Sequence, residues 1–239
     1  MNLILFERAD STLSLPRSDR RALHLIDVLR RKVGDTFDVG VVNGPRGKGT
    51  LENVNSESVS VTFSWGAIPP PCDDVTLIIG LPRPQTARAI LRDVASLGVA
   101  AIHFVTTEKG DPNYGSSTLW QSGEWRRHLL TGVEQAFCTR LPAVTFGESL
   151  ASLVAALPSS GTTKIALDNY ESPSALTQLS DFEPAVALAF GPERGWSAAE
   201  RDLFRAQNFT LAHLGTRVLR TETACIAALT LVKAKLGSL

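Results

Sequence analysis

Residues 185–196 read AVALAFGPERGW, and residues 211–224 read LAHLGTRVLRTETA. Each stretch passes from an apolar run through a glycine turn into a segment of helical character, which is the pattern of a strand followed by a helix. In a parallel sheet, ligands bind beyond the C-terminal ends of the strands. The two turns are therefore predicted to meet there and to form a small-molecule pocket of exposed backbone groups and apolar walls.

Short apolar strands and amphipathic helices alternate through the rest of the C-terminal part. Strands are predicted at 75–80, 100–105, 164–168 and 185–190, and helices at 90–97, 125–137, from Ser197 and from Thr221. Gly98 is expected to end the first helix, and Ser197 with Glu200 forms a capping box. The last helix is expected to pack Ile226, Leu229 and Val232. This alternation predicts an α/β domain whose parallel sheet is covered on both faces.

Three consecutive prolines, at positions 69–71, interrupt the chain between two different patterns. Proline fixes φ and lacks an N–H donor, so we place a domain boundary there, between residues 1–68 and 75–239. The first part alternates apolar and polar residues at 36–41 and 59–63, with turn signals at 43–45 and 47–49. It contains one predicted helix, 20–31, with Leu23, Ile26 and Leu29 on one face. A small β-barrel with one helix fits these lengths.

The composition is that of an ordinary globular protein, with 239 residues, 24 basic and 24 acidic side chains. Three widely spaced cysteines have no metal-binding spacing and suit a reducing compartment. The first residues do not form a signal peptide, and the apolar runs are too short to span a bilayer. We therefore expect a cytoplasmic protein with no membrane partner and no bound metal.

The predicted N-terminal helix and its flanks carry a local excess of positive charge. This region contains six basic residues and three aspartates, which gives a local net charge of +3 in a neutral chain. The basic residues are Arg17, Arg20, Arg21, Arg30, Arg31 and Lys32. The planar guanidinium group donates two hydrogen bonds to a phosphate, so these side chains are candidates for RNA binding. A merely solvated helix face explains the same charges equally well.

Other nucleotide and hydrolase motifs are absent from the sequence or weak. Residues 44–50, GPRGKGT, resemble a phosphate-binding loop only faintly, and a hairpin turn is the preferred interpretation. The chain has no Gly-x-Gly-x-x-Gly fingerprint, which disfavours a Rossmann enzyme. It also lacks a Gly-x-Ser-x-Gly nucleophile elbow.

The sequence resembles the 16S ribosomal RNA (uracil-N3)-methyltransferases, a family of the SPOUT class of trefoil-knotted methyltransferases. The resemblance covers nearly the whole chain. Its most specific parts are Gly191-Pro192-Glu193-x-Gly195 and the string from Leu214 to Ala224, with weaker matches at 28–35, 95–99, 107–109, 134–135 and 140–142. Three positions depart from the family pattern: Ser96, the stretch 136–139, and Arg194, where the family usually has glycine.

The resemblance implies an α/β fold with a trefoil-knotted C-terminal SPOUT domain and a PUA-like N-terminal β-barrel that binds RNA. It also implies a homodimer, S-adenosyl-L-methionine as cofactor, and 16S rRNA in the small ribosomal subunit as substrate, methylated at N3 of a uridine.

The residues of the site are expected to divide into three groups. Arg220 is the candidate that stabilises the uracil anion, and Glu222 is the candidate proton acceptor, with helix capping as the alternative for Thr221 and Glu222. Cofactor-binding residues are expected to be Leu167, Asp168, Gly191, Pro192, Glu193, Gly195, Leu214, Gly215, Leu219, Thr221, Thr223 and Ala224. Arg217 joins the N-terminal basic residues as a candidate for RNA contact.

Two alternatives stay open at this point. The first is a SPOUT methyltransferase that acts on a different nucleotide of rRNA or tRNA. The second is a non-catalytic RNA-binding protein that retains the fold, since fold alone does not establish function.

Overall fold

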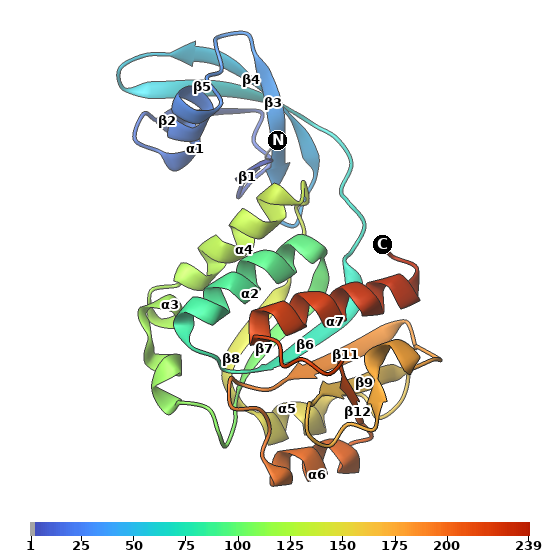
Figure 1. Cartoon of the computed structure of the whole chain (residues 1–239). Helices are drawn as coiled ribbons and strands as arrows, with labels where there is room; N and C mark the ends of the chain where they lie inside the picture. Colours follow the sequence, from blue (N-terminus) through green and yellow to red (C-terminus); the bar gives the residue numbers. More distant parts are fainter. Residues whose placement is uncertain (1–2) are drawn as a thin grey trace. The chain divides into compact units, whose positions relative to one another are not determined.

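The computed structural model describes residues 3–239, which form two compact units (Figure 1). The first unit contains the described residues up to 71 together with 133–141, and the second contains 72–132 and 142–239. The chain thus passes from the first unit to the second and back again before it completes the second.

The first unit is built on a five-stranded sheet in the order β1-β3-β4-β5-β2. Its strands are β1 (Ile4–Phe6), β2 (Thr12–Pro16), β3 (Thr36–Val41), β4 (Arg46–Val54) and β5 (Ser58–Trp65). β1 pairs with β3 in parallel, and the other neighbours are antiparallel. Apolar side chains from one face, such as Phe37, Leu51 and Val59, form the core of this unit.

The turn predicted at 47–49 is wrong, because these residues lie inside β4. A Cβ atom at Gly47 would overlap the backbone of Ser64 on β5, and one at Gly49 would lie 2.7 Å from the ring of Phe37. The glycines therefore allow close approach within the sheet, not a reversal of the chain. The turn occurs just before them, where Asn43 has φ +56°.

The N-terminal helix is shorter than predicted. It consists of α1 (Arg20–Leu23) and a π-helical turn, η1 (His24–Val28), and Arg30 with φ +53° follows it. The wider π turn changes the register of the side chains along the helix. Of the predicted apolar face, Ile26 and Leu29 pack partly buried against the core, which confirms them, whereas Leu23 is exposed; Ala22 and Leu25 are buried beside them.

The segment 133–141 completes the first unit, although it lies far along the chain. Thr139 is buried; its backbone oxygen accepts from the N–H of Asn43, and its hydroxyl donates to the oxygen of Gly44 at 2.7 Å. Arg140 Nη2 donates to the oxygen of Pro69 at 2.8 Å, and Leu3 N donates to the oxygen of Glu134. The segment begins in the last residues of α4 (Glu124–Gln135).

The second unit has a seven-stranded parallel sheet in the order β10-β12-β9-β11-β6-β7-β8. The strands are β6 (Asp73–Gly80), β7 (Val99–Thr106), β8 (Ala143–Ser149), β9 (Thr162–Leu167), β10 (Ser174–Ala175), β11 (Ala185–Phe190) and β12 (Thr210–His213). The predicted strands at 75–80, 100–105, 164–168 and 185–190 are confirmed within a residue or two. β11 lies between β6 and β9, so the loops after these three strands emerge side by side.

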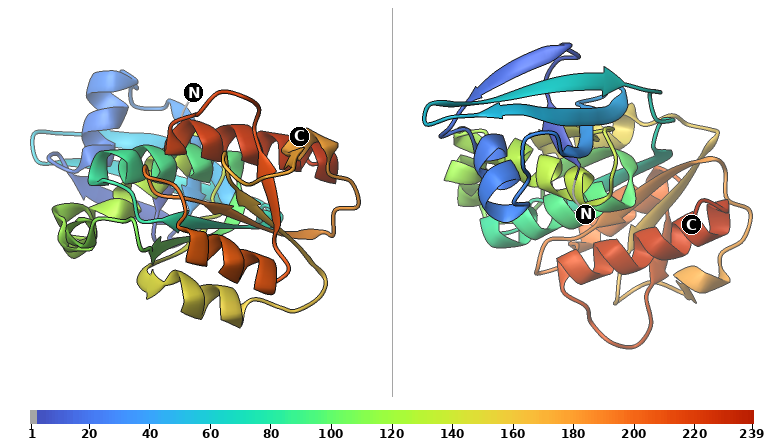
Figure 2. Two further views of the ribbon diagram at one scale, coloured as in Figure 1. Left: turned by 60° about the horizontal axis from the view of Figure 1, so that its bottom comes forward. Right: turned by 90° about the horizontal axis from the view of Figure 1, so that it is seen from above.

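Helices cover both faces of this sheet (Figure 2). α2 (Pro84–Leu97) and α7 (Thr221–Leu236) pack on one face, and α5 (Leu150–Ala156) and α6 (Ala198–Ala206) pack on the other. Two further short elements, η2 (Pro112–Ser116) and α3 (Thr118–Gln121), precede α4, and η3 (Leu176–Gln178) follows β10. None of the helices in residues 3–239 is long and apolar enough to cross a membrane.

Local helix signals in the sequence are confirmed, with one exception on α7. α2 ends at Gly98, which has φ +73°, and Ser197 and Glu200 cap α6 reciprocally. Leu229 and Val232 are buried on α7 as predicted. The prediction for Ile226 is wrong, because its side chain is exposed, while Cys225 and Ala228 face the core.

Candidate functional site

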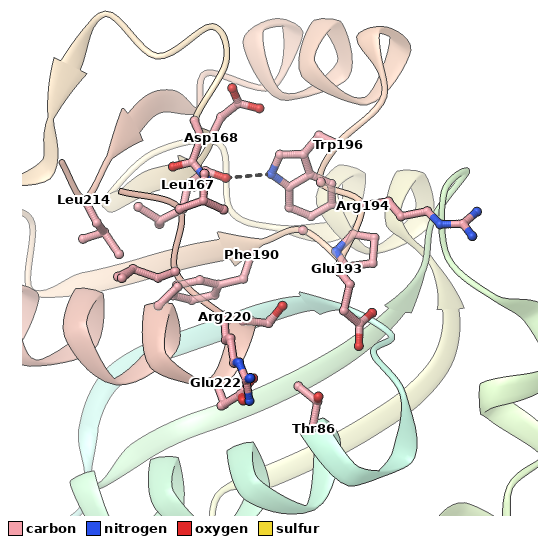
Figure 3. A pocket seen from close by; sticks show the side chains of 18 of the residues that line it. Thr86, Leu167, Asp168, Phe190, Glu193, Arg194, Trp196, Leu214, Arg220 and Glu222 are labelled. Atoms are coloured by element: carbon pink, nitrogen blue, oxygen red, sulfur yellow. Dashed lines mark hydrogen bonds between the residues drawn. The ribbon is translucent and has the colours of Figure 1, made fainter. Parts of the chain in front are cut away.

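A cavity of about 380 Å³ lies at the C-terminal edge of the parallel sheet, within the second unit (Figure 3). Its walls are the loops 167–170, 190–196 and 214–224, with Arg83 and Thr86 at the start of α2. The two glycine turns of the sequence thus meet around one cavity, as predicted. Its volume falls within the range of small-molecule sites, roughly 300–1,000 Å³.

Glycine is required where the loop after β11 folds against its neighbours. A Cβ at Gly191 would lie 3.0 Å from Gly195 Cα, and one at Gly80 would lie 2.5 Å from Pro192 Cδ. Gly195 itself has φ +66°, a conformation that other residues rarely adopt, and its N–H donates to the oxygen of Pro192. These glycines bring the backbone of 191–195 against β6 and leave its polar groups at the cavity.

Trp196 fixes the loop after β11 to the loop after β9. Its side chain is fully buried, and its Nε1 donates to the oxygen of Leu167 at 3.0 Å (Figure 3). The oxygen of Trp196 accepts from Lys109 Nζ at 2.7 Å. Glu200 adds a second connection, since its carboxylate accepts the N–H groups of Glu108 and Ser197. The cavity wall is therefore held from several sides before any ligand binds.

The loop 214–220 forms the opposite wall and leaves much of its backbone unpaired. Gly215, with φ +111°, donates its N–H to His213 Nδ1 at 3.0 Å. Within residues 3–239, the N–H groups of 216–219 have no protein partner. Arg220 is the N-cap residue of α7 and makes no side-chain cap bond, whereas Glu222 lies in the first turn, where its charge can stabilise the helix dipole, so the capping alternative stays open for Glu222. The free N–H groups and the positive end of the helix dipole favour polar and anionic ligand groups.

Asp168 shapes the cavity through its backbone loop. Its Oδ1 accepts the N–H groups of Tyr170 and Glu171, and its Oδ2 accepts from Arg201 Nε at 2.6 Å. Both oxygens are therefore used within the protein, and the carboxylate is buried. Asp168 organises the loop that a ligand would contact and does not offer a free charge.

Charged side chains of both signs stand at the rim of the cavity. Arg220 and Glu222 line it from the start of α7, and neither has an ion-pair partner among the described residues. Glu193 is engaged instead: its Oε1 accepts the N–H of Arg83 at 3.1 Å and lies 3.7 Å from Arg83 Nε. Arg194 and Arg217 also line the cavity without an ion-pair partner among the described residues. Arg220 and Glu222 are therefore a cation and an anion at this rim that no ion pair within the described chain neutralises.

Most residues predicted for the site line this one cavity. They are Leu167, Asp168, Gly191, Pro192, Glu193, Gly195, Leu214, Leu219, Thr221 and Ala224, together with Arg217, Arg220 and Glu222. Gly215 and Thr223 do not line it, although both belong to its third loop. The sequence analysis missed Arg83, Thr86, Asn169, Tyr170, Phe190, Arg194, Trp196 and Val218. Arg83 and Thr86 could have been found only from the pairing of β6 with β11, which the sequence does not reveal.

The basic residues of the first unit differ in their availability. Arg17 pairs with Asp27 at 3.6 Å, Arg20 with Glu134 at 3.5 Å and Arg21 with Asp19 at 2.8 Å. The side chains of the cluster 30–32 are exposed, and none of the three has an ion-pair partner in the described part of the chain. Among the six basic residues predicted to contact RNA in this unit, those at 30–32 are therefore the three without an ion pair in the described chain.

No candidate metal site accompanies the cavity: residues 3–239 contain no group of three or more His, Cys, Asp or Glu side chains that could hold an ion. Cys225 is buried in α7, and burial raises the pKa of its thiol. A thiol in this environment stays protonated and unreactive.

Comparisons with known proteins agree over nearly the whole chain. The model of the RNA methyltransferase domain family matches residues 69–233. The chain is 35% identical to ribosomal RNA small subunit methyltransferase E of Treponema pallidum, over 98% of this chain and 91% of that protein. It is 28% identical to ribosomal RNA small subunit methyltransferase E 1 of Borreliella burgdorferi, over 99% of both.

Solved structures share the fold at lower identity. A crystal structure of ribosomal RNA small subunit methyltransferase E from Neisseria gonorrhoeae, bound to S-adenosyl methionine, has a TM-score of 0.81 at 21% identity and covers 98% of this chain and 97% of that one. A Legionella pneumophila protein solved with the same cofactor has a TM-score of 0.80 at 24% identity, with 97% and 96% covered. The chain therefore belongs to the RNA methyltransferase domain family, as a member of the 16S ribosomal RNA methyltransferases of the SPOUT class.

Proposed function

We propose that this protein uses S-adenosylmethionine to methylate N3 of a uridine in the 16S rRNA of the small ribosomal subunit. One observation carries the proposal: two glycine loops of a methyltransferase-family chain enclose a cavity with unpaired backbone N–H groups beside the free side chains of Arg220 and Glu222. The family relatives named for small-subunit rRNA methylation cover almost the full chain, which supports the same substrate here.

The residues of the cavity fit an adenosine-containing ligand. Backbone N–H and C=O groups of the loops 190–196 and 214–220 can form hydrogen bonds with the polar edge of a purine. The apolar side chains of Leu167, Phe190 and Leu219 can cover the faces of its ring. The N–H groups of 216–219 have no protein partner in the described chain, so they are available to ligand oxygens. When bound, S-adenosylmethionine supplies an electrophilic methyl group on a sulfonium sulfur.

Arg220 and Glu222 act on the uracil base in this proposal. N3 of uridine carries a proton, and its electron pair becomes nucleophilic when that proton leaves. Glu222 accepts the proton on its carboxylate, and the Arg220 guanidinium stabilises the negative charge that develops on the base. Because the base is itself the nucleophile, no covalent cysteine is needed, in keeping with the buried Cys225.

The basic cluster 30–32 and Arg217 bind the RNA backbone in this proposal. Their side chains are exposed and lack ion-pair partners in the described chain, so they can neutralise phosphates without first breaking an internal pair. Arg17, Arg20 and Arg21 contribute less, because each is paired with a carboxylate.

We further propose that the first unit is a PUA-like barrel and that the second carries the trefoil knot of its class. The five-stranded sheet of the first unit and the strand order β12-β9-β11-β6 of the second support this interpretation. A homodimer is proposed with the exposed face of α7, including Ile226, as part of its interface. A protein that modifies ribosomal subunits would work in the cytoplasm.

Methyl transfer from labelled cofactor to small subunits that lack the modification tests the function. Nucleoside mass spectrometry of the product should reveal N3-methyluridine in 16S rRNA. Methylation of tRNA, or a different modified nucleoside, would instead support a SPOUT methyltransferase that acts on another nucleotide of rRNA or tRNA. Absence of binding heat with S-adenosylmethionine would leave only the non-catalytic alternative.

A further inference from the structure

The mouth of the cavity carries two unusually exposed apolar side chains. Val218 is 79% exposed and Tyr170 is 78% exposed, more than any other large hydrophobic residue of the described chain. Both line the cavity, from opposite walls. Single exposed apolar side chains are common on protein surfaces, but these two line the cavity and can therefore contact its ligand. Tyr170 is the more informative of the two, because an aromatic ring is a specific recognition group for planar ligands.

The ring of Tyr170 is held in place by its surroundings. The N–H of Tyr170 donates to Asp168 Oδ1 at 2.6 Å, which fixes the backbone that carries the ring. The guanidinium of Arg201 lies 5.3 Å from the ring centroid, and Tyr170 Cε2 lies 3.8 Å from the position of a Cβ on Gly195. Arg201 has only 8% of its side chain exposed, so the ring is supported from beneath by a buried group.

Tyr170 is 78% exposed although it lines the cavity, so little of the protein covers its ring. A second planar group must arrive at the mouth during the proposed reaction, because the target base has to leave its helix or loop to meet the methyl donor. Protein recognition of unpaired RNA bases commonly uses stacking on aromatic side chains.

We propose that Tyr170 stacks on the uracil of the target nucleotide and orients it for methyl transfer. This inference rests on the proposed function and adds a residue that contacts the substrate, on the loop after β9. Stacking on one face leaves the edge of the base that carries N3 free to face Arg220 and Glu222. Tyr170 thereby selects a flat, unpaired base, and the charged residues of α7 act on its N3 group.

Steady-state methylation of unmodified small subunits by the full-length protein tests the inference, with Tyr170→Leu and Tyr170→Phe compared to wild type. Leucine keeps apolar bulk and removes the aromatic face, so we expect kcat/KM for subunits to fall roughly 5- to 150-fold, the range for one lost base–aromatic stack, mostly through KM. Phenylalanine keeps the ring and should stay within about twofold of wild type, below the smallest effect of a lost stack. Tyr114→Leu, in η2 outside the cavity, is the matched control for loss of a tyrosine and should also match wild type.

Calorimetry with S-adenosylmethionine is measured on each variant, with circular dichroism as a check on folding. Unchanged cofactor affinity in Tyr170→Leu, together with the raised KM, supports stacking on the base. A loss of cofactor affinity equal to the loss in kcat/KM would assign the ring to the cofactor and overturn the inference, as would wild-type kinetics in Tyr170→Leu. Failure of the wild-type protein itself to transfer methyl groups would instead overturn the proposed function, and this inference with it.

Discussion

Arg201 Nε lies 2.6 Å from Asp168 Oδ2, and the two side chains are only 8% and 1% exposed. This ion pair joins α6 to the loop after β9. Asp168 also accepts two backbone N–H groups of that loop, and Arg201 lies behind the ring of Tyr170. A buried pair outside the reaction therefore determines the shape of one cavity wall.

Removal of Arg201 should destabilise the protein and loosen the ligand site together. Arg201→Ala leaves the carboxylate of Asp168 buried without its cation, a change that costs about 3–5 kcal/mol of unfolding free energy in comparable pairs. Urea unfolding measures this loss, and calorimetry with S-adenosylmethionine measures the weaker binding. Arg205→Ala is the control on the same helix: its partners Glu171 and Asp202 are exposed, so little change is expected. Equal effects of the two substitutions would contradict the role of the buried pair.

Arg220→Ala should separate catalysis from cofactor binding. The guanidinium is free and stands at the cavity rim, where it can stabilise charge that exists only during the reaction. We expect turnover to fall about 10²- to 10³-fold, as for the loss of one transition-state donor, with cofactor affinity nearly unchanged. Arg92→Ala removes an exposed arginine that pairs with Asp93 and does not line the cavity, so this variant should retain activity. Full turnover of the Arg220 variant would exclude its proposed role.

Gly80→Ala, at the end of β6, should displace the loop 190–196, which follows the neighbouring strand β11. The added Cβ would lie 2.5 Å from Pro192 Cδ and 2.7 Å from Pro192 N, so the backbone of the loop must move. We expect a loss of about 1–3 kcal/mol in unfolding free energy, typical of overpacking, together with weaker cofactor binding. At Gly115 the nearest atom is 3.5 Å away, and Gly115→Ala should be silent in both measurements. Normal cofactor affinity in the Gly80 variant would show that the loop tolerates displacement.

The salt dependence of RNA binding tests the cluster 30–32. If Arg31 contacts a phosphate, Arg31→Ala should reduce the slope of log K against log salt by about 0.7–0.9, because one fewer counterion is released. Arg20→Ala should change the slope less, since its guanidinium lies 3.5 Å from Glu134. Filter binding to 16S rRNA at several salt concentrations supplies both slopes. Identical slopes for wild type and the Arg31 variant would remove this residue from the RNA interface.

The ion pair at the start of α1 makes stability depend on pH. The Arg21 side chain, hydrogen-bonded to Asp19, lowers the pKa of that carboxyl below its ordinary value of 3.8. A lowered acid pKa stabilises the fold above 3.8, and the contribution is lost as the pH falls through the folded-state pKa. Asp19→Asn should therefore be less stable than wild type at pH 7, and the difference should shrink below pH 3.8. Asp10→Asn is the matched control, because Asp10 lies 4.0 Å from its exposed partner Arg8.

Local signals in the sequence predicted local structure well. Gly98 as a helix end and Ser197 with Glu200 as a capping box depend on neighbours within four residues, and both are confirmed. The two glycine turns were found for the same reason, and the parallel-sheet rule brought them together correctly. Family resemblance, not periodicity, supplied the cofactor and the substrate.

Features that depend on distant contacts were missed. Nothing near Gly47 in the sequence shows that a strand passes against it, so it was taken for a turn residue. The pairing of Arg201 with Asp168 likewise joins segments far apart in the chain, and the π turn at 24–28 has no local signal that predicted it. Tyr170 was not predicted as a site residue, because its position at the cavity and its exposure are properties of the folded chain and not of the sequence around it.

The return of residues 133–141 to the first unit has a consequence for synthesis. Domains usually fold in order as they leave the ribosome, the N-terminal one first. Here the sheet of residues 4–65 still lacks Thr139 and Arg140 when its last strand emerges, because residues 72–132 of the second unit must be translated in between. The first unit is therefore completed only after residues 133–141 have been synthesised. For the same reason, a single cut between residues 71 and 72 releases neither unit as an intact fragment.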